Sequence, residues 1–309
     1  MAGGSKKVIY AALIGNALIA ITKFAAASMT RSSAMMSEGI HSLVDTGNQV
    51  LLLHGIKQSQ KPADANFPFG HGKEIYFWSF VVAISIFAIG AGVSVYEGVH
   101  RLRSPHPVEN VTINYIVLGF AMLFEGGAWY MALREFQKAK GSRGTIAAVR
   151  RGKDPTLFVV LFEDSAAMLG LMIAFLGVLL GDITNNSMWD GIAAILIGVI
   201  LAATAAWLAA ETKGLLIGES ARPEVVEGAK RIAENVPSIQ HVNEVLTLHM
   251  GPEYILVTLS AEFRDGAQAD QIEVAIAEFT ERLKSEFPLV KRVFVEAESR
   301  FSQSPPATP

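Results

Sequence analysis

The chain has 309 residues, of which 51% are hydrophobic and 18% are charged, and its formal net charge at pH 7 is −3. A mean hydropathy of +0.35 is too apolar for an ordinary soluble enzyme. So small a net charge does not indicate a nucleic-acid partner. The sequence contains no cysteine, which excludes disulfides and thiolate metal ligands.

Apolar stretches long enough to cross a membrane recur along the first two thirds of the chain. Ile75–Tyr96 and Gly191–Ala210 carry no formal charge, and a bilayer core requires about 20 helical residues. The first stretch reads as a retained helix rather than a signal peptide. The sequence therefore predicts an α-helical membrane protein with a transport domain over residues 1–214. Its six transmembrane helices would cover about residues 8–29, 36–57, 74–99, 111–134, 155–181 and 188–211.

Basic residues gather on one side of these predicted helices. They are Lys6, Lys7, Lys57, Lys61, Lys73, Arg134, Lys138, Lys140, Arg143, Arg150, Arg151, Lys153 and Lys213. The other side holds only Arg31, Arg101 and Arg103. Since basic loops stay in the cytoplasm, we expect both termini there. The short loops and the lack of a targeting segment favour a bacterial inner membrane.

The composition changes after Gly218. Residues 223–236 and 268–287 show the apolar spacing of amphipathic helices. Strands are predicted over 242–250, 254–263 and 289–295, with Val242, Leu246, Leu248 and Met250 on one face of the first. Gly251-Pro252 reads as the turn of a hairpin. The order αββαβ predicts a small, ferredoxin-like α+β cytoplasmic domain at residues 219–299, followed by a disordered tail at 300–309.

The second predicted helix contains an imidazole and a carboxylate that an apolar helix does not need. His41 and Asp45 are four residues apart and project from the same helix face. Ionisable groups at membrane depth are costly and usually mark a substrate or proton route. Imidazole with carboxylate suits Zn²⁺. The alternative is a hydrogen-bonded pair that joins two helices.

A second acidic pair lies early in the fifth predicted helix. Glu163 and Asp164 are adjacent within an apolar run, and two carboxylates cannot both ionise cheaply in hydrocarbon. A divalent cation or shared protons would compensate them; the alternative is that one of the two carboxylates faces the polar boundary near Pro155. If the second and fifth helices pack together, these two carboxylates, His41 and Asp45 could surround one cation.

Three segments together resemble the cation diffusion facilitator family of ZnT-like zinc transporters. They are SEGIHSLVDTGNQ (37–49), FPFGHGKE (67–74) and EDSAAMLGLMIAFLG (163–177). The resemblance covers residues 8–299. It implies a homodimer that exchanges Zn²⁺ or a related divalent cation for protons by alternating access. It also implies a transport site with two residues from the second helix and two from the fifth. His41, Asp45 and Asp164 match that pattern.

The sequence departs from the family pattern at several ligand positions. Val160 stands where the family usually has His or Asp, so Glu163 is the candidate for the missing ligand, with Asn48 or water as the fallback. In the loop site, Asp64 and His71 match but Phe67 replaces a His, which favours a structured loop over a metal site. The tail-domain zinc positions hold Asn243, Leu259, Glu296 and Glu298, so we expect no tight zinc binding there.

Other polar residues lie within the predicted helices. We expect Lys23 to snorkel to the membrane surface, the alternative being that it neutralises a carboxylate of the site. Glu97 should lie at the membrane boundary, and Glu125 should pair between helices; the alternative is that both are proton-relay groups.

The resulting prediction is a Zn²⁺/proton antiporter that is not an enzyme and whose cytoplasmic domain dimerises. Three alternatives remain at this point: transport of Mn²⁺, Fe²⁺ or Co²⁺, a metal-regulated membrane scaffold without transport, and an intramembrane metallohydrolase. The last is disfavoured because the sequence has no HExxH motif.

Overall fold

The computed structural model describes residues 2–105, 110–140 and 155–299. The chain divides into two compact units. One is helical and covers Met1–Gln58 and Glu74–Lys213. The other combines Gly214–Pro309 with the loop Ser59–Lys73. Four basic residues of the predicted cytoplasmic side (Arg143, Arg150, Arg151 and Lys153) and the predicted disordered tail lie outside the described residues.

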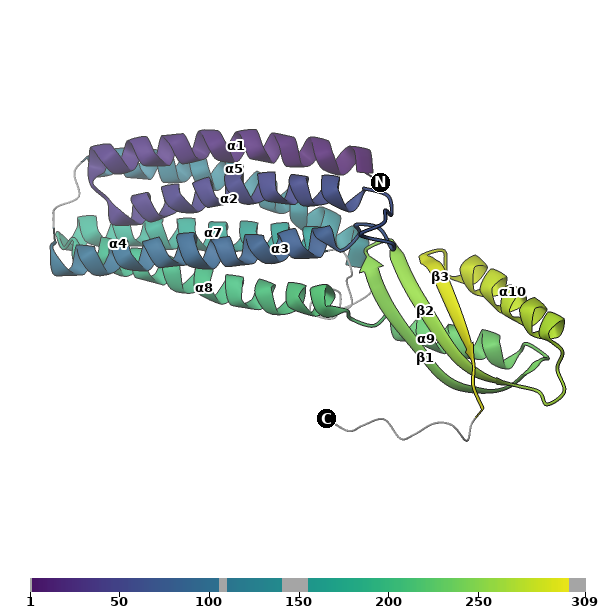
Figure 1. Ribbon diagram of the computed structural model, residues 1–309. Helices are drawn as coiled ribbons and strands as arrows, with labels where there is room; N and C mark the ends of the chain where they lie inside the picture. The colour runs from purple at the N-terminus through teal and green to yellow at the C-terminus, as the bar shows by residue number, and fades with distance from the viewer. Residues whose placement is uncertain (1, 106–109, 141–154, 300–309) are drawn as a thin grey trace. The chain divides into compact units, whose positions relative to one another are not determined.

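The helical unit consists of long helices that run lengthwise beside one another (Figure 1). They are α1 (Ala2–Thr30), α2 (Ser33–Ser59), α3 (Glu74–Ser85) continued by η1 (Ile86–Ala91) and α4 (Gly92–Arg103), α5 (Val111–Lys140), α7 (Pro155–Thr184) and α8 (Met188–Ile217). The segment α3–η1–α4 is one continuous helix with a π-helical turn in its middle, which the apolar pattern did not predict.

Five of the described helical segments are long and apolar enough to cross a membrane: Leu13–Thr30, Glu74–Arg103, Val111–Lys138, Phe158–Thr184 and Met188–Ile217. Helix α2 has 27 residues, which is long enough to span a bilayer. Its many polar side chains make it less apolar than the five segments above. Large apolar residues such as Leu18, Leu123 and Phe124 are exposed, whereas charged residues such as Lys23 and Glu38 are buried. A polar interior inside an apolar exterior is what a bilayer requires of an integral membrane protein.

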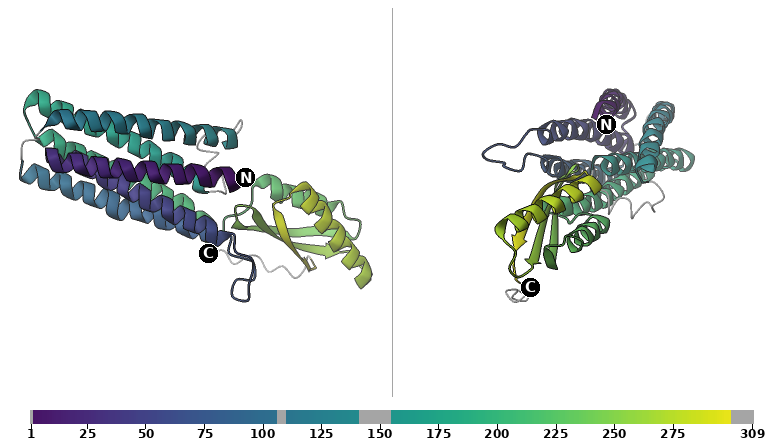
Figure 2. Two further views of the ribbon diagram at one scale, coloured as in Figure 1. Left: turned by 90° about the horizontal axis from the view of Figure 1, so that it is seen from above. Right: turned by 90° about the vertical axis from the view of Figure 1, so that its right-hand side faces the viewer.

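The second unit is a three-stranded sheet with both helices on one face (Figure 2). Its elements are α9 (Pro223–Glu234), β1 (Ile239–Gly251), β2 (Tyr254–Phe263), α10 (Ala269–Glu286) and β3 (Val290–Ala297). Strand β1 pairs antiparallel with β2, and β2 pairs parallel with β3. The predicted αββαβ order is confirmed. Val257 and Leu259 of β2 face Ala229 and Phe279 in the core.

The predicted face of β1 is wrong beyond Val242. The pairing of β1 with β2 shifts register between Val242 and Glu244, and an extra residue in a strand moves every later side chain to the opposite face. Val242 is therefore in the core and Val245 packs against it. Leu246, predicted to share the face of Val242, is 56% exposed.

The loop Ser59–Lys73 belongs to the second unit because it packs against the β1–β2 turn. A methyl group at Gly72 would overlap with the backbone oxygen of Met250, so this contact tolerates no side chain. The Phe69 and Phe294 rings meet edge to face, with centroids 6.5 Å apart.

Candidate metal-transport site

Helix α2 presents its polar residues to the interior of the helical unit. His41 and Asp45 are 1% and 3% exposed, and His41 Nδ1 lies 3.4 Å from Asp45 Oδ1. Neither ring nitrogen of His41 has a hydrogen-bond partner, nor does Asp45 Oδ1. Buried polar atoms are normally hydrogen-bonded. Lone pairs left unpaired at this depth are those that a bound cation could use.

The two helices that carry the candidate ligands are in contact. The side-chain amide of Asn48 on α2 donates a 2.6 Å hydrogen bond to Glu163 Oε1 on α7. The carboxyl group of Asp45 is also within side-chain hydrogen-bonding reach of Glu163. Asp164 is 9% exposed and close enough to Asp45 for an electrostatic interaction. Asn48 and Glu163, which are 115 positions apart in sequence, therefore meet in a buried space. This contact brings together the second and fifth predicted helices, which a shared cation site requires.

These side chains do not form a completed ligand sphere. Among the residues that the structure describes, no group of three or more His, Asp or Glu side chains is arranged to hold a metal ion. The amide group of Asn48, rather than a further carboxylate, contacts Glu163. Polar sites are often looser before their ligand binds, and small side-chain rotations would be needed to bring these oxygens and the imidazole onto one ion.

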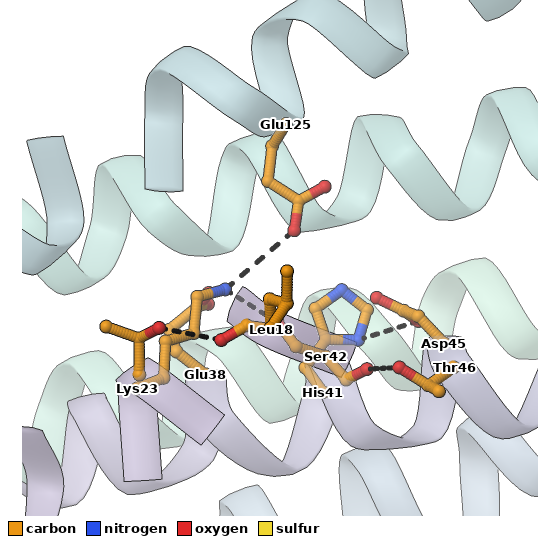
Figure 3. Close-up of polar contacts among 9 residues, drawn as sticks. Leu18, Lys23, Glu38, His41, Ser42, Asp45, Thr46 and Glu125 are labelled. Carbon is orange, nitrogen blue, oxygen red and sulfur yellow. Dashed lines mark hydrogen bonds and ion pairs between the residues drawn. The ribbon is translucent and has the colours of Figure 1, made fainter. Parts of the chain in front are cut away.

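A buried charged cluster adjoins the His41–Asp45 pair (Figure 3). Lys23 Nζ of α1 lies 3.1 Å from Glu38 Oε2 and donates a 2.8 Å hydrogen bond to Ser42 Oγ, both on α2. It lies 3.9 Å from Glu125 Oε1 of α5. The side chain of Lys23 is fully buried. The prediction that it snorkels is therefore wrong, because two acidic partners inside the protein compensate its charge. Glu125 pairs between helices as predicted.

Asp190, at the start of α8, is a buried residue that the sequence reasoning missed. Its carboxylate accepts hydrogen bonds from the Ser32 hydroxyl and from the backbone N–H groups of Ser33 (2.6 Å) and Ala34 (3.3 Å). Arg101 Nε lies 3.4 Å away. Asp190 thus caps the N-terminus of α2 from another helix and ties it to α4. The sequence signal was an Asp that directly precedes the last apolar run, on the same predicted side of the membrane as Arg101 and Arg103 at the end of the third span.

The loop residues Asp64 and His71 form a local structure. Asp64 Oδ1 accepts hydrogen bonds of 2.8 Å from the N–H groups of both Asn66 and Phe67. The bond from Phe67 is the main reason that the pKa of Asp64 lies below its usual value. His71 Nδ1 lies 3.2 Å from the oxygen of Pro62, and Nε2 lies 3.5 Å from Asp64 Oδ2. The carboxylate is thus already engaged by the loop backbone.

The tail-domain positions are occupied by contacts within the protein. Asn243 Nδ2 donates to Ser260 Oγ (3.2 Å) and to the backbone oxygen of Glu298 (3.0 Å), and Ser260 donates to Glu298 Oε2 (2.9 Å). Leu259 lies in the core and offers no ligand atom. The absence of tight zinc binding here remains a prediction.

Comparison with known proteins points to metal transport. A family model described as the cation efflux transmembrane domain matches residues 9–217. The human protein named proton-coupled zinc antiporter SLC30A9, mitochondrial, is 34% identical over 250 residues, which are 80% of this chain and 44% of that protein. Metal tolerance protein C4 of Arabidopsis thaliana is 30% identical over 80% of this chain and 55% of its own length.

A third relative matches over nearly its whole length. The manganese efflux system protein MneP of Bacillus subtilis is 21% identical over 305 residues, covering 97% of each chain. By contrast, this chain spans about half the length of the zinc antiporter and the plant protein. The names of these relatives therefore include both zinc and manganese.

Proposed function

The chain belongs to the cation efflux family, the cation diffusion facilitators, and we propose that it carries a divalent metal ion across a membrane in exchange for protons. The observation that most supports this is the approach of the buried acidic residues of α2 and α7, with Asn48 bonded to Glu163 at 2.6 Å. Carboxylates and an imidazole buried inside a membrane unit need a cation or protons to offset their burial.

We propose that the transported ion binds His41, Asp45, Glu163 and Asp164. Zn²⁺ takes nitrogen and oxygen ligands in a tetrahedron, which matches one imidazole with three carboxylates. The relative named as a zinc antiporter supports Zn²⁺. Because one relative is named as a manganese efflux protein, Mn²⁺ is the alternative ion. An imidazole ligand favours Zn²⁺ over Mn²⁺, which prefers oxygen ligands.

Exchange with protons follows from the chemistry of these ligands. Imidazole and carboxylate bind metal only in their deprotonated forms, so metal and protons compete for the same groups. Two states that open to opposite sides of the membrane, with different affinities for metal and proton, would convert a proton gradient into metal movement.

We further propose that the second unit joins two copies of the chain. The face of its sheet opposite the helices carries Leu246 and Phe294, which are 56% and 43% exposed. Apolar groups that stay this exposed, although the Phe69 ring meets that of Phe294, favour a protein partner on this face. A second copy is the partner that the family resemblance implies.

The host membrane is a separate proposal. The basic loops support cytoplasmic termini, and a bacterial inner membrane fits the short loops. The zinc antiporter relatives are named as mitochondrial, which makes an organellar membrane the alternative.

Flux measurements in proteoliposomes test the transport function. Zn²⁺ added outside vesicles with an acidic interior should enter as protons leave, and Mn²⁺ in parallel samples reports selectivity. His41→Ala and Asp45→Ala should each lower the rate at least about tenfold. His54→Ala removes an exposed imidazole from the same helix and should leave the rate unchanged. Wild-type protein without metal-driven proton flux would refute the proposal and favour a non-transporting scaffold.

A further inference from the structure

The Lys23–Glu38–Glu125 cluster joins three helices inside the helical unit. Lys23 extends from α1 to Glu38 on α2 at 3.1 Å and to Glu125 on α5 at 3.9 Å, so one ammonium group serves two carboxyl groups (Figure 3). The side chains of Lys23 and Glu38 are fully buried and that of Glu125 is 2% exposed. Bulk water therefore does not solvate any of the three charges.

The formal charges of this cluster do not balance. One ammonium and two ionised carboxylates sum to −1, and an unbalanced charge in a low-dielectric interior is costly. A single bound proton would make the cluster neutral. An ammonium with one carboxylate and one neutral carboxylic acid is the form that the surroundings favour.

The contacts indicate which carboxyl group holds the proton. Glu38 Oε2 is the nearer partner of Lys23, which stabilises its ionised form. Its other oxygen, Oε1, faces Gly170 of α7, where an added methyl group would overlap with it. Glu125 Oε1 lies beyond hydrogen-bond distance of Lys23 and, like Glu38 Oε1, has no hydrogen-bond partner. Glu125 is thus the carboxyl group less engaged by the ammonium.

We propose that Glu125, held beside the Lys23–Glu38 ion pair, binds a proton that is released when the metal ion binds, at a position separate from the metal ligands. This inference rests on the proposed function. It adds a dedicated proton site to the competition at the ligands themselves. Lys23 and Glu38 act as positioning residues that set the charge around Glu125.

Coupling between the two sites is electrostatic. Glu38 and Asp45 are seven positions apart on α2, about 10 Å along a helix that rises 1.5 Å per residue. At this separation charges interact appreciably when water is excluded. A divalent cation among the ligands would favour an ionised Glu125, and a protonated Glu125 would weaken metal binding by the same factor. Charged or titratable groups from three helices surround this region: Lys23 of α1, Glu38, His41 and Asp45 of α2, and Glu163 and Asp164 of α7.

Infrared difference spectroscopy on the purified full chain in lipid tests this site, with Zn²⁺ as the probe. The metal-free wild type near neutral pH should show a carboxylic acid C=O band that Glu125→Gln lacks. Glu97→Gln, which changes a half-buried glutamate on α4, should retain that band. Saturating Zn²⁺ should abolish it. Equal C=O intensity in wild type and Glu125→Gln, or a band that persists with Zn²⁺, would overturn the proposal.

A second variant keeps the test decisive if Glu125→Gln does not fold. Lys23→Met removes the ammonium, so both carboxyl groups should be protonated and the metal-free spectrum should gain a further C=O band. An unchanged spectrum would overturn the proposal. Because the metal-free band is read without transport, its absence is distinguishable from a failure of zinc exchange, which would appear in the wild-type flux.

Discussion

The side-chain amide of Asn48 donates a hydrogen bond of 2.6 Å to Glu163 Oε1, and this bond connects α2 to α7 beside Asp45. It places the side chain of Glu163 among the residues of the candidate site. Val160 stands where the family usually has a metal ligand, but its side chain has no nitrogen or oxygen atom that could bind a metal ion. The bond is the strongest structural reason to regard Glu163 as the replacement.

Replacing Glu163 should therefore impair metal transport more than replacing Val160. Glu163→Gln keeps the size of the side chain but removes a charged oxygen ligand, so we expect Zn²⁺ affinity to fall about 10–100-fold. Val160→Ala removes only apolar volume and serves as the control. Calorimetric titration of Zn²⁺ into both variants measures the difference. Equal and negligible effects would move the fourth ligand elsewhere.

Asp190 should be important for stability rather than for metal binding. Asp190→Ala leaves Arg101, which is 3% exposed, without its acidic partner and removes the cap of α2. Breaking a buried ion pair in this way costs about 3–5 kcal/mol. Asp182→Ala, at an exposed carboxylate on α7, should cost less than about 1 kcal/mol. Denaturant unfolding in detergent compares them, and similar midpoints would contradict the assigned role of Asp190.

Gly170→Ala should disturb the buried charged cluster through packing alone. The added methyl group would overlap with Glu38 Oε1, so either the carboxyl group or α7 must shift, at a cost of about 1–3 kcal/mol. Gly127→Ala on α5 is the matched control, because an added methyl group there has open space around it. Thermal unfolding of the two variants should separate them, whereas equal stability would argue that Glu38 is free to move.

The loop Ser59–Lys73 should loosen in acid. The pKa of Asp64 is held below its usual value, first by the Phe67 N–H group, so the ionised form is favoured in the folded state. Its stabilising effect is present above the usual pKa of 3.8 and is lost as pH falls through the lower folded-state pKa. The amide signals of Asn66 and Phe67 in NMR spectra should shift over that range. They should not titrate in Asp64→Asn; a shift in that variant would assign the effect to another group.

Much of the fold could be predicted from the sequence because long apolar runs and alternating strands have few competing structures. The features that the sequence did not predict depend on contacts between segments that are distant in sequence. The pairing of β1 with β2 shifts register at Asn243, whose side chain bonds to Ser260 and Glu298, and periodicity does not reveal such a shift. The burial of Lys23 depends on Glu38 and Glu125 from other helices. The role of Asp190 depends on its hydrogen bond to Ser33 at the N-terminus of α2, which is 157 residues away in sequence.

In the candidate site, too, local spacing could be predicted from the sequence and contacts between helices could not. The spacing of His41 and Asp45 predicted a shared helix face, and their 3.4 Å approach agrees with it. The sequence indicated Glu163 and Asn48 only as alternative candidates for the missing ligand; the contact between them depends on the packing of α2 on α7.

X-ray absorption at the zinc edge of the metal-loaded chain tests the central claim most directly, because it reports the atoms bound to the ion. We predict about four nitrogen and oxygen ligands near 2.0 Å with scattering from one imidazole. That scattering should vanish in His41→Ala and persist in His71→Ala. If it survives the loss of His41, the ion is held elsewhere, and a transport site between α2 and α7 is contradicted.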